Sequence, residues 1–139
     1  MDISALDGSD PRSYSARVAG PAALLVAKIH KIAERADSPN RLYDKDAHDI
    51  YRLLVAVDTA SIAATLGMLL NDPLSRPATS YALDQLDVLF AQGPESLGST
   101  MAGRAEEGIG DPATVALAVS LLATDILAEM RTNPTGEEI

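Results

Sequence analysis

The sequence predicts an all-α fold, a single-domain bundle of five or six helices with at most one short N-terminal extended segment. Apolar residues recur at helical spacing in several segments. Of the 139 residues, 47% are hydrophobic but only 4% are aromatic, as expected for a core of Ala, Leu, Val and Ile between close-packed helices. Proline, glycine and Asp/Asn clusters separate these segments at helix-like lengths. The chain is long enough for one domain with a real core.

The first helix is predicted over residues 21–36. Residues 1–20 are expected to be a loosely ordered N-terminal segment, in which Ser13–Val18 is the one candidate extended stretch. Gly20-Pro21 favours a helix start, because proline at the first helical position sacrifices no hydrogen bond. The apolar positions that follow at helical spacing are Leu25, Ile29, Ile32 and Ala36.

Two further helices are predicted in the middle of the chain. Asp44 is a candidate N-cap for the second helix, because a short acidic side chain can accept the free N–H groups of a first turn. Asp58-Thr59 either caps a third helix that runs to Leu70, or the second helix simply continues. Asn71-Asp72-Pro73 ends this region. The apolar face of the second helix comprises Ile50, Leu53, Leu54 and Val57.

The C-terminal part is predicted to form three helices. The fourth runs over Pro77–Ala91, and the fifth opens at Gly93-Pro94 and ends near Gly108. The last covers Pro112–Arg131 behind an Asp111 cap, and its apolar residues on nearly every side predict a central position. The helical domain is thus expected to span residues 21–131, followed by a disordered tail over residues 132–139.

Charge and composition exclude several classes of protein. A formal net charge of −9 disfavours DNA, RNA and anionic membranes, because phosphate surfaces require a basic footprint. The chain has no cysteine, and its acidic N-terminus lacks the basic and apolar regions of a signal peptide. The apolar stretch Val115–Ala128 is interrupted by polar residues and is expected to be too short to cross a bilayer. We therefore expect a cytoplasmic protein that contacts neither membrane nor nucleic acid.

The first two helices carry the most informative charges. Lys28, Lys31 and Arg35 lie along one edge of the first apolar face, while Asp46 and Asp49 lie at the start of the second. The short connection makes the two helices neighbours, so the bases and acids should meet at partial burial. Two interpretations remain open: an ion-pair cluster that fixes the packing of the helices, or a phosphate-binding site that the aspartates orient.

The pattern LLVAK…IAER…KDAHDIYRLL resembles the C-terminal motifs of the AbiEii-like nucleotidyltransferases, a family of abortive-infection and toxin–antitoxin proteins. The resemblance covers Gly20 to about Val57. It implies that Lys28, Arg35, Lys45, Asp46 and Asp49 lie on the nucleotide side of a site, with Lys28 facing the triphosphate. In this family an upstream, strand-rich half supplies a Gly-Ser turn and a metal-binding Asp-x-Asp pair.

This chain departs from the family at that catalytic half. Gly8-Ser9-Asp10 lacks a strand–turn–helix context, and Asp44 and Asp46 stand at a helix start, where their side chains diverge. No catalytic or metal-binding residue is therefore assigned to the chain alone, and Mg²⁺ with a nucleoside triphosphate is expected only if the missing half is supplied. The resemblance implies a module that is inactive by itself.

The alternative is a small, non-catalytic helical interaction or dimerisation module whose charged seam is structural. Either interpretation predicts a homodimer, or a partner protein that covers the first helix, because a missing half would leave that face open. His30 and His48 also raise the idea of an HD-type metal phosphohydrolase. Two histidines are too few for that site, and both are expected to be surface residues pointing away from the charged seam.

Overall fold

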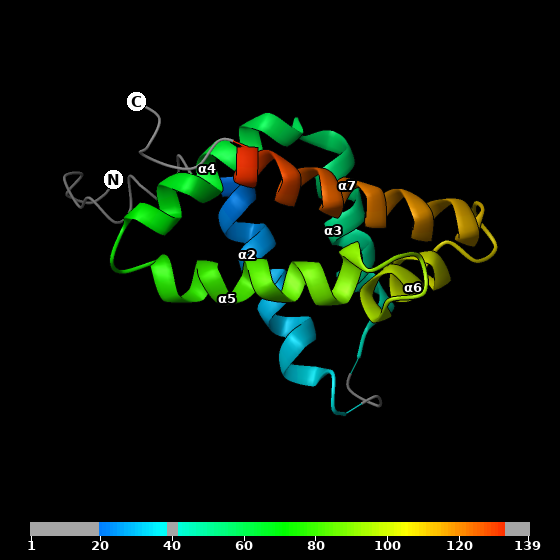
Figure 1. Cartoon of the computed structure of the whole chain (residues 1–139). Helices are drawn as coiled ribbons and strands as arrows, with labels where there is room; N and C mark the ends of the chain where they lie inside the picture. The colour runs from blue at the N-terminus through cyan, green and yellow to red at the C-terminus, as the bar shows by residue number, and fades with distance from the viewer. Residues whose placement is uncertain (1–19, 39–41, 133–139) are drawn as a thin grey trace, which may run out of the picture.

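The computed structural model describes residues 20–38 and 42–132, and within them the fold is all-α (Figure 1), which confirms the predicted fold class. The predictions for residues 1–19 and 133–139, including the extended stretch Ser13–Val18 and the disordered tail, lie outside the described residues. The described elements are α2 (Gly20–Arg35), α3 (Asp44–Ala56), α4 (Thr59–Asn71), α5 (Arg76–Leu86), the π-helical turn η2 (Asp87–Ala91), α6 (Leu97–Arg104) and α7 (Pro112–Thr132).

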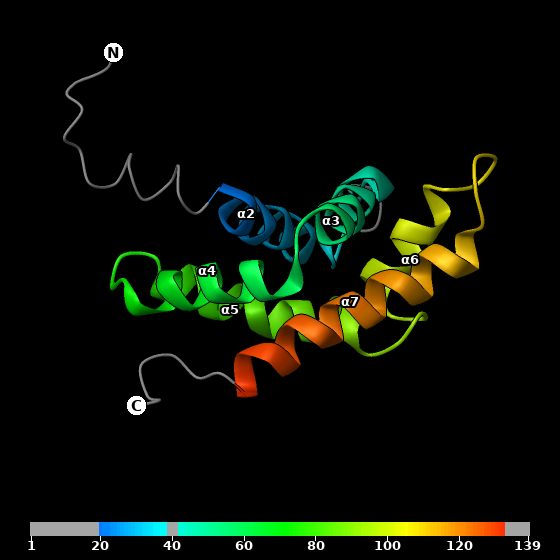
Figure 2. The same ribbon diagram turned by 90° about the horizontal axis from the view of Figure 1, so that it is seen from above.

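The helices are arranged so that α2 and the last helix lie on different sides. Seen from above in Figure 2, α2 lies on one side of the molecule and α7 on the opposite side, with α4 and α5 between them. Helix α2 contacts α3, α4 and α5, whereas α7 contacts α3, α4, α6 and η2. Helix α3 therefore packs against both α2 and α7.

The core is filled as the composition predicts, with aliphatic side chains around a single aromatic ring. Phe90 is the only phenylalanine and is fully buried. Its ring lies against Gly98, where an added Cβ would stand only 2.5 Å from the Phe90 Cζ atom. The remaining large, fully buried apolar side chains come from six helices: Leu25, Ile29, Ile32, Ile50, Ile62, Leu66, Leu86, Met101, Val119 and Ile126.

Two capping predictions have different outcomes. Asp58 caps α4, because its carboxylate accepts the Ser61 backbone N–H at 3.1 Å, and so α3 and α4 are separate helices. Asp44 is not an N-cap. Tyr43 occupies that position in extended conformation, and Asp44 is the first residue of α3. Its carboxylate is used elsewhere, in an ion pair with Arg104.

The fourth and fifth helices differ from their predicted bounds. The segment predicted over Pro77–Ala91 is α5 followed by η2, whose wider turn buries both Leu89 and Phe90. The predicted fifth helix is much shorter, since α6 covers only Leu97–Arg104. Each end of the predicted fifth helix has a glycine with a positive φ, +122° at Gly93 and +83° at Gly108. Regular helix cannot include these left-handed residues.

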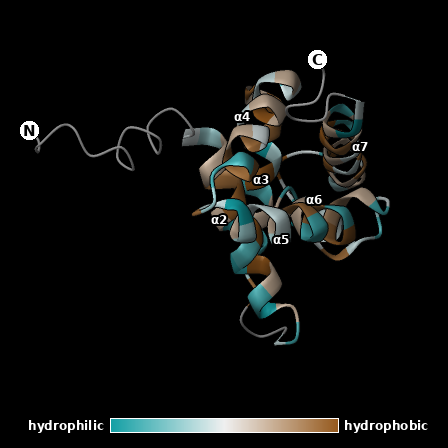
Figure 3. Ribbon diagram, turned by 60° about the vertical axis from the view of Figure 1, so that its left-hand side comes forward, coloured by the Kyte–Doolittle hydropathy of each residue, from teal (hydrophilic) through white to brown (hydrophobic). Residues whose placement is uncertain are grey.

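The last helix follows its predicted span but not its predicted place. Asp111 caps α7, accepting hydrogen bonds from the Ala113 N–H and the Thr114 hydroxyl. The prediction that α7 is central is wrong. Leu117 and Leu121 remain 48% and 55% exposed, because α7 lies at the side of the bundle and buries only the face toward its neighbours (Figure 3).

Helix α7 also bears on the membrane prediction. It has 21 residues with a mean hydropathy of 1.7 over its most apolar window, which is long and apolar enough to cross a bilayer by length and composition alone. A helix of a water-soluble bundle can meet the same criterion. The expectation that this stretch is too short is thus wrong, whereas the absence of membrane contact stays a prediction.

Candidate functional site at the α2–α3 seam

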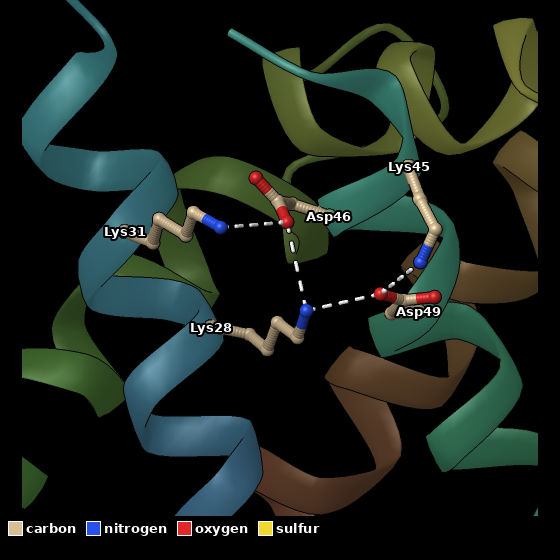
Figure 4. A network of polar contacts seen from close by, with 5 residues as sticks. All are labelled: Lys28, Lys31, Lys45, Asp46 and Asp49. Atoms are coloured by element: carbon tan, nitrogen blue, oxygen red, sulfur yellow. Dashed lines mark hydrogen bonds and ion pairs between the residues drawn. The ribbon is translucent and has the colours of Figure 1, made fainter.

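The charges of α2 and α3 meet as the helical wheel predicts. Lys28 and Lys31 project from α2 toward Asp46 and Asp49 at the N-terminal end of α3, as Figure 4 shows. Lys45 approaches Asp49 from one turn earlier on α3 itself. These five side chains are called the Lys–Asp cluster below. Ile29 and Ile50, which follow Lys28 and Asp49 in the sequence, are both buried in the hydrophobic core.

The cluster is an alternating chain of acids and bases. Lys28 Nζ lies at its centre, 3.0 Å from an Asp49 oxygen and 3.6 Å from an Asp46 oxygen. Lys31 Nζ is 3.4 Å from that same oxygen of Asp46, and Lys45 Nζ is 3.3 Å from Asp49. Each carboxylate is therefore bound by two ammonium groups, and Lys28 is the one base that joins both acids.

Burial within the cluster is uneven. The Asp46 side chain is only 7% exposed, while Lys28 is 23% and Lys31 is 42% exposed. A carboxylate that has lost most of its water requires nearby positive charge, which the two lysines of α2 supply. The acids consequently lie on the inner side of the cluster and the ammonium groups are more open to solvent.

The pKa values follow from these contacts. The hydrogen bond to Asp49 raises the pKa of Lys28 above its ordinary value, because this effect exceeds the opposing effect of burial. Partial burial alone would raise the pKa of Asp49, but the hydrogen bonds from Lys28 and Lys45 outweigh it, so that the pKa is lowered. Both groups are therefore charged across the neutral pH range.

Arg35, the other predicted base, lies one turn beyond Lys31 at the end of α2. The structure places its guanidinium carbon 5.8 Å from the ring centroid of Tyr43, the residue just before α3. A cation over an aromatic face is a favourable contact that also ties the end of α2 to the start of α3. Of the five predicted nucleotide-side residues, the structure thus joins four into one cluster and places the fifth against Tyr43.

The cluster includes every lysine in the sequence. The chain has eight arginines but only three lysines, namely Lys28, Lys31 and Lys45, and all three contact Asp46 or Asp49. Arginine would serve as well or better in a purely structural ion pair, whereas lysine offers a compact ammonium group on a flexible stem. This gathering joins residues of two helices that follow each other in the sequence.

Two further polar contacts of α3, to residues beyond the Lys–Asp cluster, were not anticipated from sequence. Arg104, at the end of α6, donates two hydrogen bonds to Asp44, which raises the pKa of the guanidinium. His48 binds the Glu106 carboxylate through Nε2. Because the partners lie 60 and 58 residues apart, no local pattern in the sequence could have paired them. Asp44 and Asp46 therefore point to different partners, as their positions at a helix start predict.

The histidines are partly exposed, and each one makes a polar contact with another helix or loop. Beyond its contact with Glu106, His48 lies near the Tyr51 ring. His30 Nε2 is 2.9 Å from the carbonyl oxygen of Ala78, which joins α2 to α5. Each histidine nonetheless lies away from the Lys–Asp cluster, as the wheel predicts. Within residues 20–38 and 42–132, no group of three or more His, Cys, Asp or Glu side chains is placed to hold a metal ion.

Comparisons with protein-family models, with characterised proteins and with solved structures find no match to this chain. The resemblance to the AbiEii-like nucleotidyltransferases therefore stays a prediction that rests on the residues from Gly20 to about Val57. The site itself stands on its geometry, an alternating cluster of three lysines and two aspartates where two helices meet.

Proposed function

We propose that the Lys–Asp cluster is the phosphate-facing edge of a helical module similar to the C-terminal part of AbiEii-like nucleotidyltransferases. One observation carries the proposal: all three lysines of a chain with net charge −9 gather around only two carboxylates. The cluster therefore carries one more positive than negative charge. A local positive excess on an otherwise acidic protein favours an anionic ligand.

The arrangement of donors suits a triphosphate. An ammonium group has three N–H donors, and the described contacts of Lys31 and Lys45 each use one carboxylate partner. Their remaining donors can turn toward phosphate oxygens on the solvent side. Lys28 is held more firmly, by both aspartates, and so its ammonium group is oriented before a ligand arrives. Lys28, held between the two more exposed lysines, would bind successive phosphate groups together with them.

The proposed role is to position the nucleotide and not to carry out the reaction. Two aspartates that are already neutralised by lysines are poor ligands for Mg²⁺, which prefers free carboxylates and phosphate oxygens. A second segment or protein would therefore provide the metal-binding carboxylates, and Mg²⁺ with the triphosphate would lie between the two parts. Lys28, Lys31 and Lys45 would orient the phosphates, and Asp46 and Asp49 would orient the lysines.

A second candidate function is a non-catalytic interaction module in which the cluster only fixes the angle between α2 and α3. The burial of Asp46 favours this alternative, because a carboxylate that is 7% exposed needs Lys28 and Lys31 for stability alone. In that case the lysines serve only to neutralise the two aspartates. The two candidates therefore differ in whether a triphosphate can compete for the ammonium groups.

Thermal unfolding with and without nucleoside triphosphate and Mg²⁺ tests the proposal. At a ligand concentration about ten times Kd, binding adds about 1.4 kcal/mol and raises the Tm of a chain of this size by roughly 5 °C. The wild type should show this rise and Lys28→Met should not. Arg104→Met is the matched control, since it removes an ion pair between α3 and another helix but leaves the cluster intact.

The reference for each measurement is sodium chloride at the same ionic strength, which removes general salt effects. A rise in the wild type and Arg104→Met, absent in Lys28→Met, supports phosphate binding at the cluster. Equal shifts in all three proteins, or none in any, contradict it and favour the interaction module.

A further inference from the structure

Tyr43 has the most exposed aromatic ring among the residues that the structure describes. The residue is 64% exposed, compared with 43% for Tyr81, and Phe90 is fully buried. Its backbone is extended, with φ −118° and ψ 118°, so that neighbouring side chains point to opposite sides of the chain. Leu42 accordingly packs against the core, whereas the Tyr43 side chain is directed toward solvent. Packing of the core therefore does not account for this aromatic ring.

Arg35 connects the exposed ring to the Lys–Asp cluster. The Arg35 guanidinium carbon lies over the Tyr43 ring, 5.8 Å from its centroid. Because Arg35 follows Lys28 by seven residues, both project from the same edge of α2, roughly 10 Å apart along the helix axis. Lys31 lies between them, and Tyr43 directly precedes the helix that contributes Lys45. The ring therefore lies at one end of the cluster, beside the last turn of α2.

This end of the seam is accessible. Figures 1 and 3 show the C-terminal end of α2 extending beyond the other helices. Arg35 covers only part of the ring, since 64% of Tyr43 remains open to solvent. Nucleic-acid bases stack on exposed aromatic rings, while cationic side chains bind the phosphates. An accessible ring at the end of a row of ammonium groups therefore suits both parts of one nucleotide.

We propose that Tyr43 is the stacking platform for the base of the nucleotide whose phosphates the Lys–Asp cluster binds. This inference rests on the phosphate site proposed above and adds the residue that recognises the nucleoside. The phosphates lie at Lys28, Lys31 and Lys45, the ribose follows the last turn of α2, and the base stacks on the Tyr43 ring. Every base has a π face, so the platform distinguishes a nucleotide from an inorganic polyphosphate and accepts any of the common bases.

The first test compares two ligands by isothermal titration calorimetry in the presence of Mg²⁺. ATP has a base, whereas inorganic tripolyphosphate has a chain of three phosphates and no base. Tyr43→Ala should weaken the binding of ATP by about 10-fold or more, because the stacking contact is lost, and should leave the affinity for tripolyphosphate unchanged. Tyr81→Ala is the matched control. Tyr81 is an exposed tyrosine of α5 whose ring lies beside His30, and its removal should change neither affinity.

The second test uses the absence of tryptophan in the chain. Tyr43→Trp keeps an aromatic platform and makes it the only indole in the protein. ATP should quench the fluorescence of this indole, because the base stacks on it directly, whereas tripolyphosphate should not. Tyr81→Trp is the control and should respond to neither ligand. Both positions are exposed, so these substitutions do not disturb the core, and circular dichroism verifies that each variant is folded.

The outcomes separate this inference from the phosphate site. Binding of ATP that Tyr43→Ala weakens and Tyr81→Ala and Tyr43→Trp retain, with quenching at position 43 by ATP alone, supports the platform. Equal affinity of the wild type and Tyr43→Ala for ATP, with tripolyphosphate still bound, overturns the platform and leaves the phosphate site standing. Loss of tripolyphosphate binding in Tyr43→Ala also overturns it, because Tyr43 then acts through the cluster and not through a base. A wild-type chain that binds neither ligand contradicts both proposals.

Discussion

Removing the lysines of the Lys–Asp cluster one at a time should produce a graded loss of stability. Methionine is the suitable replacement, because it keeps an apolar stem of similar length and removes only the charge. Lys45 is 82% exposed and pairs with Asp49 within one helix. Lys45→Met should therefore lower the free energy of unfolding by at most about 0.5 kcal/mol.

The changes on α2 should cost more because their partners are more deeply buried. Lys28→Met leaves each carboxylate one lysine, Lys31 for Asp46 and Lys45 for Asp49, so we expect a loss of about 1–2 kcal/mol. Adding Lys31→Met leaves Asp46, at 7% exposure, without either of its α2 lysines. The double variant should lose about 3–5 kcal/mol, which is more than the sum of the single losses.

Urea unfolding of the wild type, the two single α2 variants, the double variant and Lys45→Met measures these differences directly. Lys28→Met together with Asp46→Asn should recover part of the loss, because the unpaired charge is then removed as well. The reasoning is refuted if Lys28→Met costs no more than Lys45→Met, or if the losses from Lys28→Met and Lys31→Met simply add.

Three further predictions concern pH, packing and activity. The lowered pKa of Asp49 contributes stability that is present above about pH 4 and is lost as pH falls through the folded-state pKa. The raised pKa of Lys28 contributes stability that is present below about pH 10.4 and is lost as pH rises through the folded-state pKa of Lys28. The difference in urea midpoint between the wild type and Asp49→Asn should therefore be larger at about pH 7 than at about pH 3. Gly98→Ala should destabilise the fold by roughly 1–3 kcal/mol in thermal unfolding, because the new Cβ would clash with the Phe90 ring and the Leu89 carbonyl. Gly20→Ala is the control and should be nearly neutral, because the space around Gly20 is open. The isolated chain should transfer no nucleotide from labelled triphosphates and Mg²⁺ to RNA or protein acceptors, and labelling that depends on Asp44 and Asp46 would contradict this.

Sequence periodicity predicts most of this fold because each helix buries a face with its own local pattern. Leu25, Ile29 and Ile32 recur at helical spacing and are all buried. The same geometry predicts the Lys–Asp cluster, since the short link between α2 and α3 forces their charged edges together. These features depend on neighbouring segments, so a helical wheel and a loop length were sufficient to predict them.

Features that depend on distant segments could not be predicted in this way. The contacts of α3 with Arg104 and Glu106 join parts of the chain about 60 residues apart. The apolar character of α7 suggested burial on every side, but hydrophobicity does not specify whether a face is covered by the same chain. Leu117 and Leu121 show the difference, as they are apolar and exposed.

The most direct test of the proposed function is affinity labelling with periodate-oxidised nucleoside triphosphates, whose dialdehyde forms reducible imines with amines. The chain has only three lysines, all in the Lys–Asp cluster, so peptide mapping separates these sites from the N-terminal amine without ambiguity. We predict modification at Lys28 or Lys31 that an excess of the unmodified triphosphate prevents and that equal concentrations of the nucleoside do not. Modification confined to Lys45 and the N-terminal amine, or labelling that the triphosphate does not reduce, would contradict a phosphate site at this cluster.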